Sequence, residues 1–414
     1  MSRVAVIGGG LVGVCCAVFA RRAGHDVDLF ERGDIGGGAS FGNAGIMSSG
    51  GCVPMALPGV FKKLPKMLLA ANEPLSIRWS YAPKLLPWLS HFVRSAKPAR
   101  VEATSKALYR LQSAAHAAYD EIVETSAFDS QIASKGLLFP FSSKTAFEGS
   151  ARARQIRTAR GVQFEVVDRE RLYELAPDLA AGFYNGVLFG EARHALNPSR
   201  LAQKLTQDFS GSGGRVKRVA VQMVRERQTV VDVVSAEERR GYGSVVIAAG
   251  AWSRQLLGKE GAGVPLESER GYHVMLPNPG VIIPRPMIFS EFGLAVTPMQ
   301  GGVRISGLVE FAGLDAPPDF RKADRMLHRA VDLIPNLKIA GADYWMGHRP
   351  SLPDSMPVIG PPRSGSRLLF AFGHGHQGVG QAAITGKIIA ALLSDAPLPL
   401  DIRPFSPVRF SRTT

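Results

Sequence analysis

Residues 4–13 read VAVIGGGLVG, an apolar run that ends in a Gly-x-Gly-x-x-Gly turn. The apolar run predicts a short parallel strand that is buried on both faces. Within the turn, Gly8 permits a tight bend, Gly10 lets the backbone approach a pyrophosphate, and Gly13 lets the next helix pack closely on the strand. The N-terminus of that helix presents free N–H groups and a positive dipole end to the phosphates. This stretch therefore predicts a dinucleotide-binding strand, turn and helix.

The residues that follow fit the same unit. A helix is expected from Leu11 to Arg22, ended by Gly24, and a strand over 26–31 ends in Glu31. A carboxylate at this position accepts hydrogen bonds from the hydroxyl groups of a ribose. Because the residue is a glutamate rather than an arginine, a ribose 2′-hydroxyl is favoured over a 2′-phosphate. The sequence therefore indicates FAD or NAD rather than NADP.

The composition is that of an ordinary globular protein. Of the 414 residues, 45% are hydrophobic and 20% charged, and this length suits two domains or one large composite domain. The three cysteines, Cys15, Cys16 and Cys52, have neither metal-ligand spacing nor the pattern of a disulfide framework. We therefore expect no metal site and a cytoplasmic location. Neither a cleavable signal peptide nor a transmembrane helix of about 20 apolar residues is expected.

The formal net charge of +14 has two main explanations. The simpler is a solvated basic surface, and the second is a basic face that meets anionic lipid. Residues 53–98 bear on this choice, because they mix prolines and lysines with Trp79, Tyr81 and Trp88. We expect them to form either a lid over the active site or a peripheral contact with the inner face of the cytoplasmic membrane. Nucleic acid is not expected as a partner, since no helix-turn-helix, zinc-finger or aromatic RNA-binding pattern occurs.

Apolar runs and turn signals divide the chain into three kinds of segment. A discontinuous nucleotide-binding domain is expected from residues 1–55, 196–263 and 346–414. Residues 56–134 are expected to form the helical lid or membrane-facing segment. An interleaved substrate domain is expected from residues 135–195 and 264–345. The predicted fold class is therefore α/β, with a Rossmann-like nucleotide-binding domain and an interleaved α+β substrate domain.

Hydrophobic periodicity predicts the individual elements of these segments. Helices are expected at 144–160, 197–209, 320–333 and 378–393. Strands are expected at 215–224, 229–234, 244–249, 272–276, 294–298, 303–308 and 368–372, with a polar turn at 237–243.

A second loop rich in Gly, Ser and Asn follows the first unit, and an NAD enzyme has no evident need for it. Residues 32–48 read RGDIGGGASFGNAGIMS. This loop resembles the flavin-contacting loop of the FAD-dependent D-amino-acid oxidase (DAO) superfamily. The resemblance is closest to the bacterial D-amino-acid dehydrogenase branch, which includes D-proline and hydroxy-D-proline dehydrogenases.

Three further stretches resemble motifs of the same family, in the expected order. Residues 246–253 (VIAAGAWS) resemble its second FAD-binding strand and turn. Residues 347–360 (GHRPSLPDSMPVIG) resemble its C-terminal signature, and residues 372–378 (FGHGHQG) resemble its glycine turn at the flavin ring. The resemblance covers nearly the whole chain. It implies an FAD-binding domain of the GR2 type.

The resemblance also implies which residues hold FAD. Ser40, Asn43 and the amides of Ala44 and Gly45 supply donors beside the pyrophosphate and the ring. The helix that starts near Gly378 directs its positive end at the N1–C2=O edge of the ring, where negative charge develops on reduction. Noncovalent FAD is expected, because residues 36–48 contain no His or Cys and no cysteine follows position 52. The full set of expected FAD contacts is Gly8, Gly10, Leu11, Val12, Gly13, Glu31, Arg32, Ala39, Ser40, Asn43, Ala44, Gly45, Val219, Ala249, Gly250, Trp252, Gly375, His376, Gln377 and Gly378.

The candidate catalytic residues come from the same motifs. Arg349 occupies the position where the family's C-terminal signature carries the arginine that holds the substrate carboxylate, and its alternative role is a structural salt bridge. Tyr272 matches a position where relatives often place an active-site tyrosine, which donates to the carboxylate or closes the pocket; ordinary core packing is the alternative. Arg270 is a weaker candidate and His273 weaker still. His376 and Gln377 are interpreted as contacts of the flavin edge.

The expected reaction is oxidative deamination of a D-amino acid, or of a cyclic D-imino acid such as D-proline or cis-4-hydroxy-D-proline. A hydride passes from Cα to flavin N5, and the electrons leave to a quinone or another carrier. One alternative is a flavin oxidase of glycine- or sarcosine-type amines that produces hydrogen peroxide. Two others are an NAD-dependent dehydrogenase and a basic binding protein with a degenerate nucleotide fold.

Overall fold

The computed structural model describes residues 2–59, 75–123, 131–258 and 263–410. The dinucleotide unit forms as predicted, from β1 (Arg3–Ile7), α1 (Leu11–Arg22) and β2 (Asp26–Glu31). β1 lies between β2 and β14 (Ser244–Ile247), and both pairings are parallel. The middle residues of β1 are fully buried, as expected for a strand covered on both faces.

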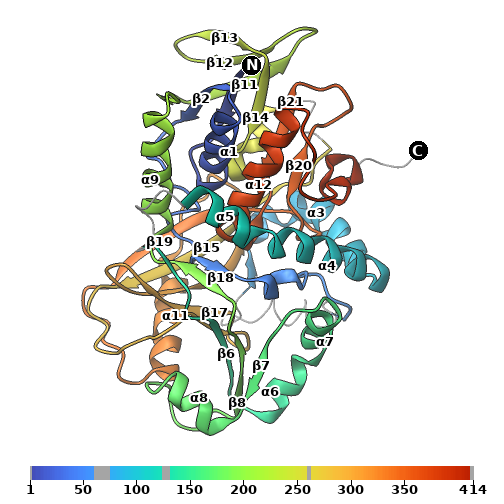
Figure 1. The fold of residues 1–414 in the computed structure, drawn as a ribbon. Helices are drawn as coiled ribbons and strands as arrows, with labels where there is room; N and C mark the ends of the chain where they lie inside the picture. Colours follow the sequence, from blue (N-terminus) through green and yellow to red (C-terminus); the bar gives the residue numbers. More distant parts are fainter. Residues whose placement is uncertain (1, 60–74, 124–130, 259–262, 411–414) are drawn as a thin grey trace.

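The nucleotide-binding half is built on a six-stranded sheet with the order β10-β2-β1-β14-β21-β20 (Figure 1). Its β20–β21 pairing is antiparallel and its other pairings are parallel. The strands not yet named are β10 (Arg215–Arg218), β20 (Val358–Gly360) and β21 (Leu368–Phe372).

The two faces of this sheet are covered differently. On one face α1 packs against α9 (Pro198–Gly211) and α12 (Gly378–Leu393), and all three share one apolar core. The opposite face packs against a three-stranded antiparallel sheet, and the residues between them form a second apolar core. The strands of that small sheet are β11 (Val221–Glu226), β12 (Val231–Ser235) and β13 (Arg239–Tyr242).

The second half of the molecule is built on a nine-stranded sheet, and Figure 1 shows it below the first. Its strand path is β19-β15-β18-β17-β16-β6-β8-β7, and β4 pairs with β18 beside this path. α11 (Phe320–Leu333) packs on β15 and β18 and completes an apolar core of its own. The strands are β4 (Leu75–Ile77), β6 (Leu137–Phe141), β7 (Glu165–Val167), β8 (Asn185–Phe189), β15 (Glu267–Leu276), β16 (Met287–Phe289), β17 (Leu294–Met299), β18 (Gly302–Phe311) and β19 (Asp343–Ser351).

Shorter elements join the two halves or flank the second sheet. β3 (Ile46–Met47), β9 (Arg193–Ala195) and β5 (Ile132–Ala133) form a small antiparallel sheet. The outer helices of the second half are α6 (Lys144–Gly149), α7 (Ala151–Ala159) and α8 (Arg169–Leu175), and the short α10 (Ser253–Leu256) follows β14.

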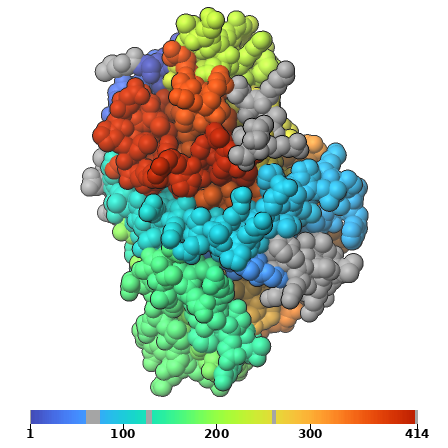
Figure 2. Space-filling view, turned by 90° about the vertical axis from the view of Figure 1, so that its right-hand side faces the viewer, coloured from blue at the N-terminus to red at the C-terminus, as the bar shows by residue number. Residues whose placement is uncertain are grey.

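Three helices form a band between the two halves: α3 (Ala82–Ser95), α4 (Pro98–Ser113) and α5 (Ala115–Val123). Figure 2 shows the blue and cyan part of this band between the red upper and the green lower regions. Residues of α4 and α5 belong to the same apolar core as α1 and α12. Helix α3 packs with Phe311 of β18 in a small core of its own. The described part of residues 56–134 therefore packs against both halves of the molecule.

The predicted membrane-facing aromatic residues have three different environments. Trp88 is buried with 6% of its surface exposed, and Tyr81 donates a hydrogen bond to Glu267 (2.8 Å). Trp79 is 71% exposed. The expectation is therefore wrong for Trp88, because its ring stacks on Phe92 and fills the space under α3. Residues 60–65, which carry two of the lysines, lie outside the described residues.

Four details differ from the sequence-based expectations. The predicted strand 215–224 is two strands, because β10 joins the parallel sheet and β11 leaves it after residues 219–220. The predicted turn at 237–243 contains β13, whose Tyr242 is buried. The predicted helix 144–160 is two helices, with a break at Ser150. The expected boundary at residue 346 falls inside β19, which belongs to the nine-stranded sheet.

Candidate active site

A cavity of about 780 Å³ is lined by residues from both large sheets and their loops. Its lining includes Glu31 and Arg32, at the end of the first unit, and Tyr272 and Arg349 of the nine-stranded sheet. Its volume lies in the range of cofactor and ligand pockets. Fifteen of the expected FAD contacts line it: Gly8, Gly10, Leu11, Val12, Glu31, Arg32, Ala39, Ser40, Asn43, Val219, Ala249, Gly250, Trp252, Gly375 and Gly378. Gly13, Ala44, Gly45, His376 and Gln377 are not among the residues that line it.

The glycine turn places the start of α1 at the cavity wall. Gly8 has a φ of +116°, and a Cβ added at Gly13 would lie 1.9 Å from the Gly8 carbonyl oxygen. The turn thus needs glycine at both positions, the first for backbone conformation and the second for close approach. Gly10 caps the helix without a side-chain hydrogen bond, and the Leu11 amide donates to Ser40 Oγ (2.9 Å). The positive end of α1 is therefore directed at the place where a pyrophosphate would lie.

The Glu31 end of the cavity suits an adenosine group. Glu31 Oε2 accepts from the Gly9 amide (2.6 Å) and Oε1 accepts from the Gly33 amide (2.9 Å), which fixes the carboxylate and leaves lone pairs for a ribose. The Arg32 guanidinium lies over the Trp252 ring, 4.1 Å from its centroid. This cation–π contact joins two lining residues that are far apart in the chain.

The Asn43 loop is anchored to both halves of the molecule. Asn43 Oδ1 accepts from the Gly45 amide (2.8 Å), and its Nδ2 donates to the His376 carbonyl (3.4 Å). Arg304 Nη1 donates to the carbonyls of Phe41 (2.8 Å) and Asn43 (2.7 Å), and burial lowers the pKa of Arg304 to about 10. The Asn43 side chain therefore orders the loop. Sequence reasoning missed Arg304, because it lies in β18 outside every motif.

Arg349 reaches the cavity from β19 and lies across β15. A Cβ added at Gly271 would be 2.1 Å from the Arg349 Cζ, so the guanidinium lies directly on this glycine. Nη1 donates to the Leu308 carbonyl (2.7 Å) and contacts Glu269 Oε1 (3.3 Å), and Nη2 donates to the Gly307 carbonyl (3.1 Å). Among the described residues, the Nε–H of Arg349 and one of its two Nη2–H groups have no hydrogen-bond partner. These two donors remain for a carboxylate.

Glu269 connects Arg349 to His376, and sequence reasoning did not single it out. Its side chain is fully buried, and its Oε1 lies 2.5 Å from His376 Nε2 as well as 3.3 Å from Arg349 Nη1. Burial favours the neutral carboxyl group, but the charges of His376 and Arg349 outweigh it and hold the pKa of Glu269 at about 2. The sequence pattern that could have indicated Glu269 is the alternation of side chains in a strand, which places residues 269, 271 and 273 on one face.

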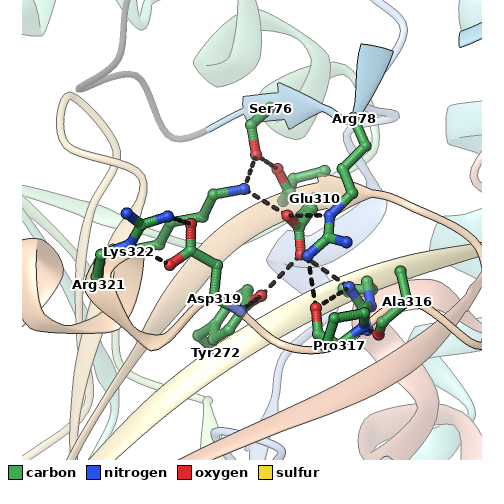
Figure 3. A network of polar contacts seen from close by, with 11 residues as sticks. Ser76, Arg78, Tyr272, Glu310, Ala316, Pro317, Asp319, Arg321 and Lys322 are labelled. Carbon is green, nitrogen blue, oxygen red and sulfur yellow. Dashed lines mark hydrogen bonds and ion pairs between the residues drawn. The ribbon is translucent and has the colours of Figure 1, made fainter. Parts of the chain in front are cut away.

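The Tyr272 hydroxyl belongs to a buried network around Glu310 (Figure 3), and Arg270 contacts the same carboxylate. Tyr272 donates to Glu310 Oε2 (2.7 Å) and accepts from the Asp319 amide (3.0 Å), while Arg270 Nη1 donates to Glu310 Oε2 (3.2 Å). Lys322 also contacts Glu310. Burial and the Glu310 charge raise the pKa of Tyr272 to about 12.

This network changes the roles expected of two residues. Tyr272 still lines the cavity, but its hydroxyl proton is engaged by Glu310 and is not free for a substrate carboxylate. The guanidinium of Arg270 is fully buried in the network and lies outside the cavity lining. The reason is the two-residue period of a strand, because residues 270 and 272 point away from the face that carries Glu269 and Gly271.

His374 and His273 are buried and neutral. His374 Nε2 contacts Thr385 Oγ1 (3.0 Å), and burial lowers its pKa to about 3. His273 stacks on Trp345 at 5.0 Å, and burial together with the Arg304 charge lowers its pKa to about 3. No group of three metal-ligating side chains occurs in the part of the chain that the structure describes. The same part contains no helix that is long and apolar enough to span a bilayer.

Comparison with known proteins agrees with this geometry. Residues 3–392 match the family model described as FAD dependent oxidoreductase, DAO. A D-amino-acid oxidase of Bradyrhizobium diazoefficiens is 36% identical over 98% of both chains. A D-amino acid dehydrogenase of Sinorhizobium medicae is 28% identical over 99% of this chain and 100% of the relative.

Solved structures show the same fold. Glycine oxidase from Geobacillus kaustophilus superimposes with a TM-score of 0.72 at 21% identity, over 99% of both chains. L-proline dehydrogenase from P. horikoshii gives a TM-score of 0.75 at 18% identity, over 99% of this chain and 98% of the other. The cavity also fits FAD, because the start of α1, which has no side-chain cap, the fixed Glu31 carboxylate and Arg349 all line it. The chain belongs to the DAO family of FAD-dependent oxidoreductases.

Proposed function

We propose that this enzyme oxidises the Cα–N bond of a D-amino acid, or of a cyclic D-imino acid of the D-proline or cis-4-hydroxy-D-proline type. The observation that carries the proposal is the position of Arg349. Its guanidinium lies directly on Gly271 in the cavity wall, with two N–H donors free among the described residues. A planar pair of donors suits a carboxylate. The relatives named D-amino-acid oxidase and D-amino acid dehydrogenase support the same substrate class.

Different residues of the chain bind the cofactor and the substrate. When bound, FAD supplies a two-electron acceptor at N5. The start of α1 and Ser40 hold the pyrophosphate, and Glu31 binds the ribose hydroxyls of the adenosine group. Arg349 binds the substrate carboxylate and thereby directs Cα–H at the flavin. The N-terminal end of α12 at Gly378 stabilises negative charge at the ring edge. The imino acid product hydrolyses in water or, if cyclic, stays an imine.

The electron acceptor in this proposal is a quinone or another carrier. Peripheral contact with a membrane would bring the enzyme to a quinone. The described surface supports this with Trp79 and Leu86, which are 71% and 61% exposed near the basic residues Lys84 and Arg94. An oxidase that produces hydrogen peroxide is the second candidate, and the oxidase name of the 36% identical relative favours it.

One experiment tests both the substrate class and the acceptor. The purified flavoprotein is mixed without oxygen with D-amino acids, D-proline, cis-4-hydroxy-D-proline, glycine and sarcosine, and flavin bleaching is recorded. Bleaching by a D-substrate, with an Arg349→Lys variant that keeps its flavin but needs much more substrate, supports the proposal. Arg403→Ala is the matched control, because Arg403 is 89% exposed. Admission of air then separates the two candidates, since fast reoxidation with stoichiometric peroxide identifies an oxidase.

A further inference from the structure

Three ionisable groups meet at the Arg349 end of the cavity. β15 supplies Glu269, β19 supplies Arg349, and the turn before α12 supplies His376. The register pairs Glu269 directly with Arg349 across the two strands. One oxygen, Glu269 Oε1, contacts both the Arg349 guanidinium and the His376 imidazole. The three groups therefore act as one electrostatic unit.

The charge of this unit decides whether it attracts an anion. A fully buried Glu269 offsets the charge of Arg349, so the pair alone is close to neutral. A neutral His376 leaves the unit without net charge, and a protonated His376 gives it a net charge of about +1. A substrate carboxylate that enters a partly desolvated cavity is bound well only when His376 is protonated.

The neighbouring ionisable groups do not supply that charge. On β15, Glu267 accepts from Tyr81, and Arg270 is paired with Glu310 on the opposite face. On β19, His348 contacts Ser268, and beside the turn His374 contacts Thr385. His376 has 41% of its side chain exposed, and its Nδ1 has no hydrogen-bond partner among the described residues. His376 is thus the group of this unit that can exchange a proton with solvent.

We propose that Glu269 is a positioning residue that makes binding of the substrate carboxylate depend on a proton on His376. Glu269 holds the imidazole Nε2 next to Arg349 and cancels the arginine charge at the same time. Carboxylate binding then takes up one proton whenever His376 is neutral in the free enzyme. This inference rests on the proposed role of Arg349 as the carboxylate-binding residue.

The test uses a ligand without an amine, because an α-ammonium group has its own titration. Cyclopentanecarboxylate has the shape of proline but no C–N bond to oxidise. Its affinity for the FAD-loaded enzyme is measured by calorimetry between pH 5.5 and pH 9, in buffers of different ionisation enthalpy. We expect the Kd to rise with pH over this range, by up to about tenfold per pH unit once His376 is neutral in the free enzyme, with uptake approaching one proton per ligand. Cyclopentanecarboxamide, which is uncharged, is the control ligand and should show no such slope.

The variants separate the role of each group. Glu269→Gln leaves Arg349 uncompensated, so at pH 9 it should bind cyclopentanecarboxylate more tightly than wild type and with little proton uptake. His376→Asn should bind weakly at every pH, and His376→Arg should restore binding that does not depend on pH. Since His376 is partly exposed, these two variants test the proposal even if Glu269→Gln does not fold.

Failure of this inference can be distinguished from failure of the proposed function. A flat pH profile in wild type, or an unchanged slope in Glu269→Gln or His376→Asn, overturns the role of Glu269. Full affinity in Arg349→Lys at all pH values would instead overturn the role of Arg349 in carboxylate binding.

Discussion

The Arg349 guanidinium lies directly on Gly271, so that a Cβ at this glycine would be 2.1 Å from Cζ. Gly271 is paired with Gly347 on β19, two residues before the arginine. The absence of a side chain on β15 is what allows the long arginine side chain to cross the strand and reach the carbonyls of Gly307 and Leu308. The position of Arg349, the proposed carboxylate-binding residue, thus depends on a residue of a neighbouring strand.

Gly271→Ala should therefore displace Arg349 without removing it. We expect the KM for a D-amino acid to rise at least tenfold, with flavin content unchanged, because the cofactor contacts lie elsewhere in the cavity. Steady-state kinetics with an artificial acceptor, together with the flavin absorbance, measure both. Gly149→Ala is the matched control, since a Cβ at Gly149 meets no atom within 4 Å. Unchanged KM in Gly271→Ala would show that Arg349 tolerates displacement.

Gly13→Ala should disrupt the dinucleotide turn. The added Cβ would be 1.9 Å from the Gly8 carbonyl oxygen, and this atom belongs to the backbone and cannot rotate away. We expect loss of bound FAD and a fall of about 1–3 kcal/mol in the free energy of unfolding. Urea unfolding and flavin content after gel filtration measure these effects. Gly211→Ala in α9, where a Cβ meets nothing within 4 Å, should be neutral or stabilising by up to about 1 kcal/mol.

Removal of the Arg304 contacts should loosen the Asn43 loop. Arg304→Met keeps much of the side-chain volume but loses the hydrogen bonds to the carbonyls of Phe41 and Asn43. We expect FAD to bind about tenfold more weakly, because two charge-assisted hydrogen bonds no longer order its loop. The Kd is measured by titration of the apoprotein with FAD and flavin fluorescence. Arg329→Met, on the exposed side of α11, is the control and should leave the Kd unchanged.

Glu310→Leu should destabilise the second half of the molecule. The change leaves Arg270 buried without its carboxylate, and such uncompensated charges typically cost about 3–5 kcal/mol. Urea unfolding of the apoprotein gives the difference in free energy. The double variant Arg270→Met with Glu310→Leu should recover a large part of it, because both charges are then absent. Equal stability of the single and double variants would argue against an energetic coupling of the pair.

Low pH should selectively weaken the contribution of Glu269 to the free energy of unfolding. Its pKa in the folded protein, about 2, lies below the ordinary value of 4.5, so the ionised group stabilises the fold above pH 4.5. This contribution, about 3 kcal/mol at most, is lost as the pH falls from about 4.5 towards 2. The difference in unfolding free energy between wild type and Glu269→Gln should therefore shrink over this range. A difference that stays constant with pH would place the pKa of Glu269 near its ordinary value.

The sequence by itself determined the nucleotide-binding half. The glycine turn, α1, β2, β21 and α12 lie where periodicity and turn residues predicted them, because each signal is local and contiguous. The local sequence pattern did not predict the break at residues 219–220. This break separates β10 of the six-stranded sheet from β11 of the small antiparallel sheet. Strand pairing was needed to place that break.

Only the tertiary structure decided which groups surround the Arg349 guanidinium. Glu269 and Arg270 are adjacent in the chain, yet one contacts Arg349 and His376 and the other is buried with Glu310. The register of β15 against β19 assigns these faces, and a shift of one residue would exchange them. Register depends on contacts between segments that are distant in the chain, and therefore no local pattern of the sequence contains it.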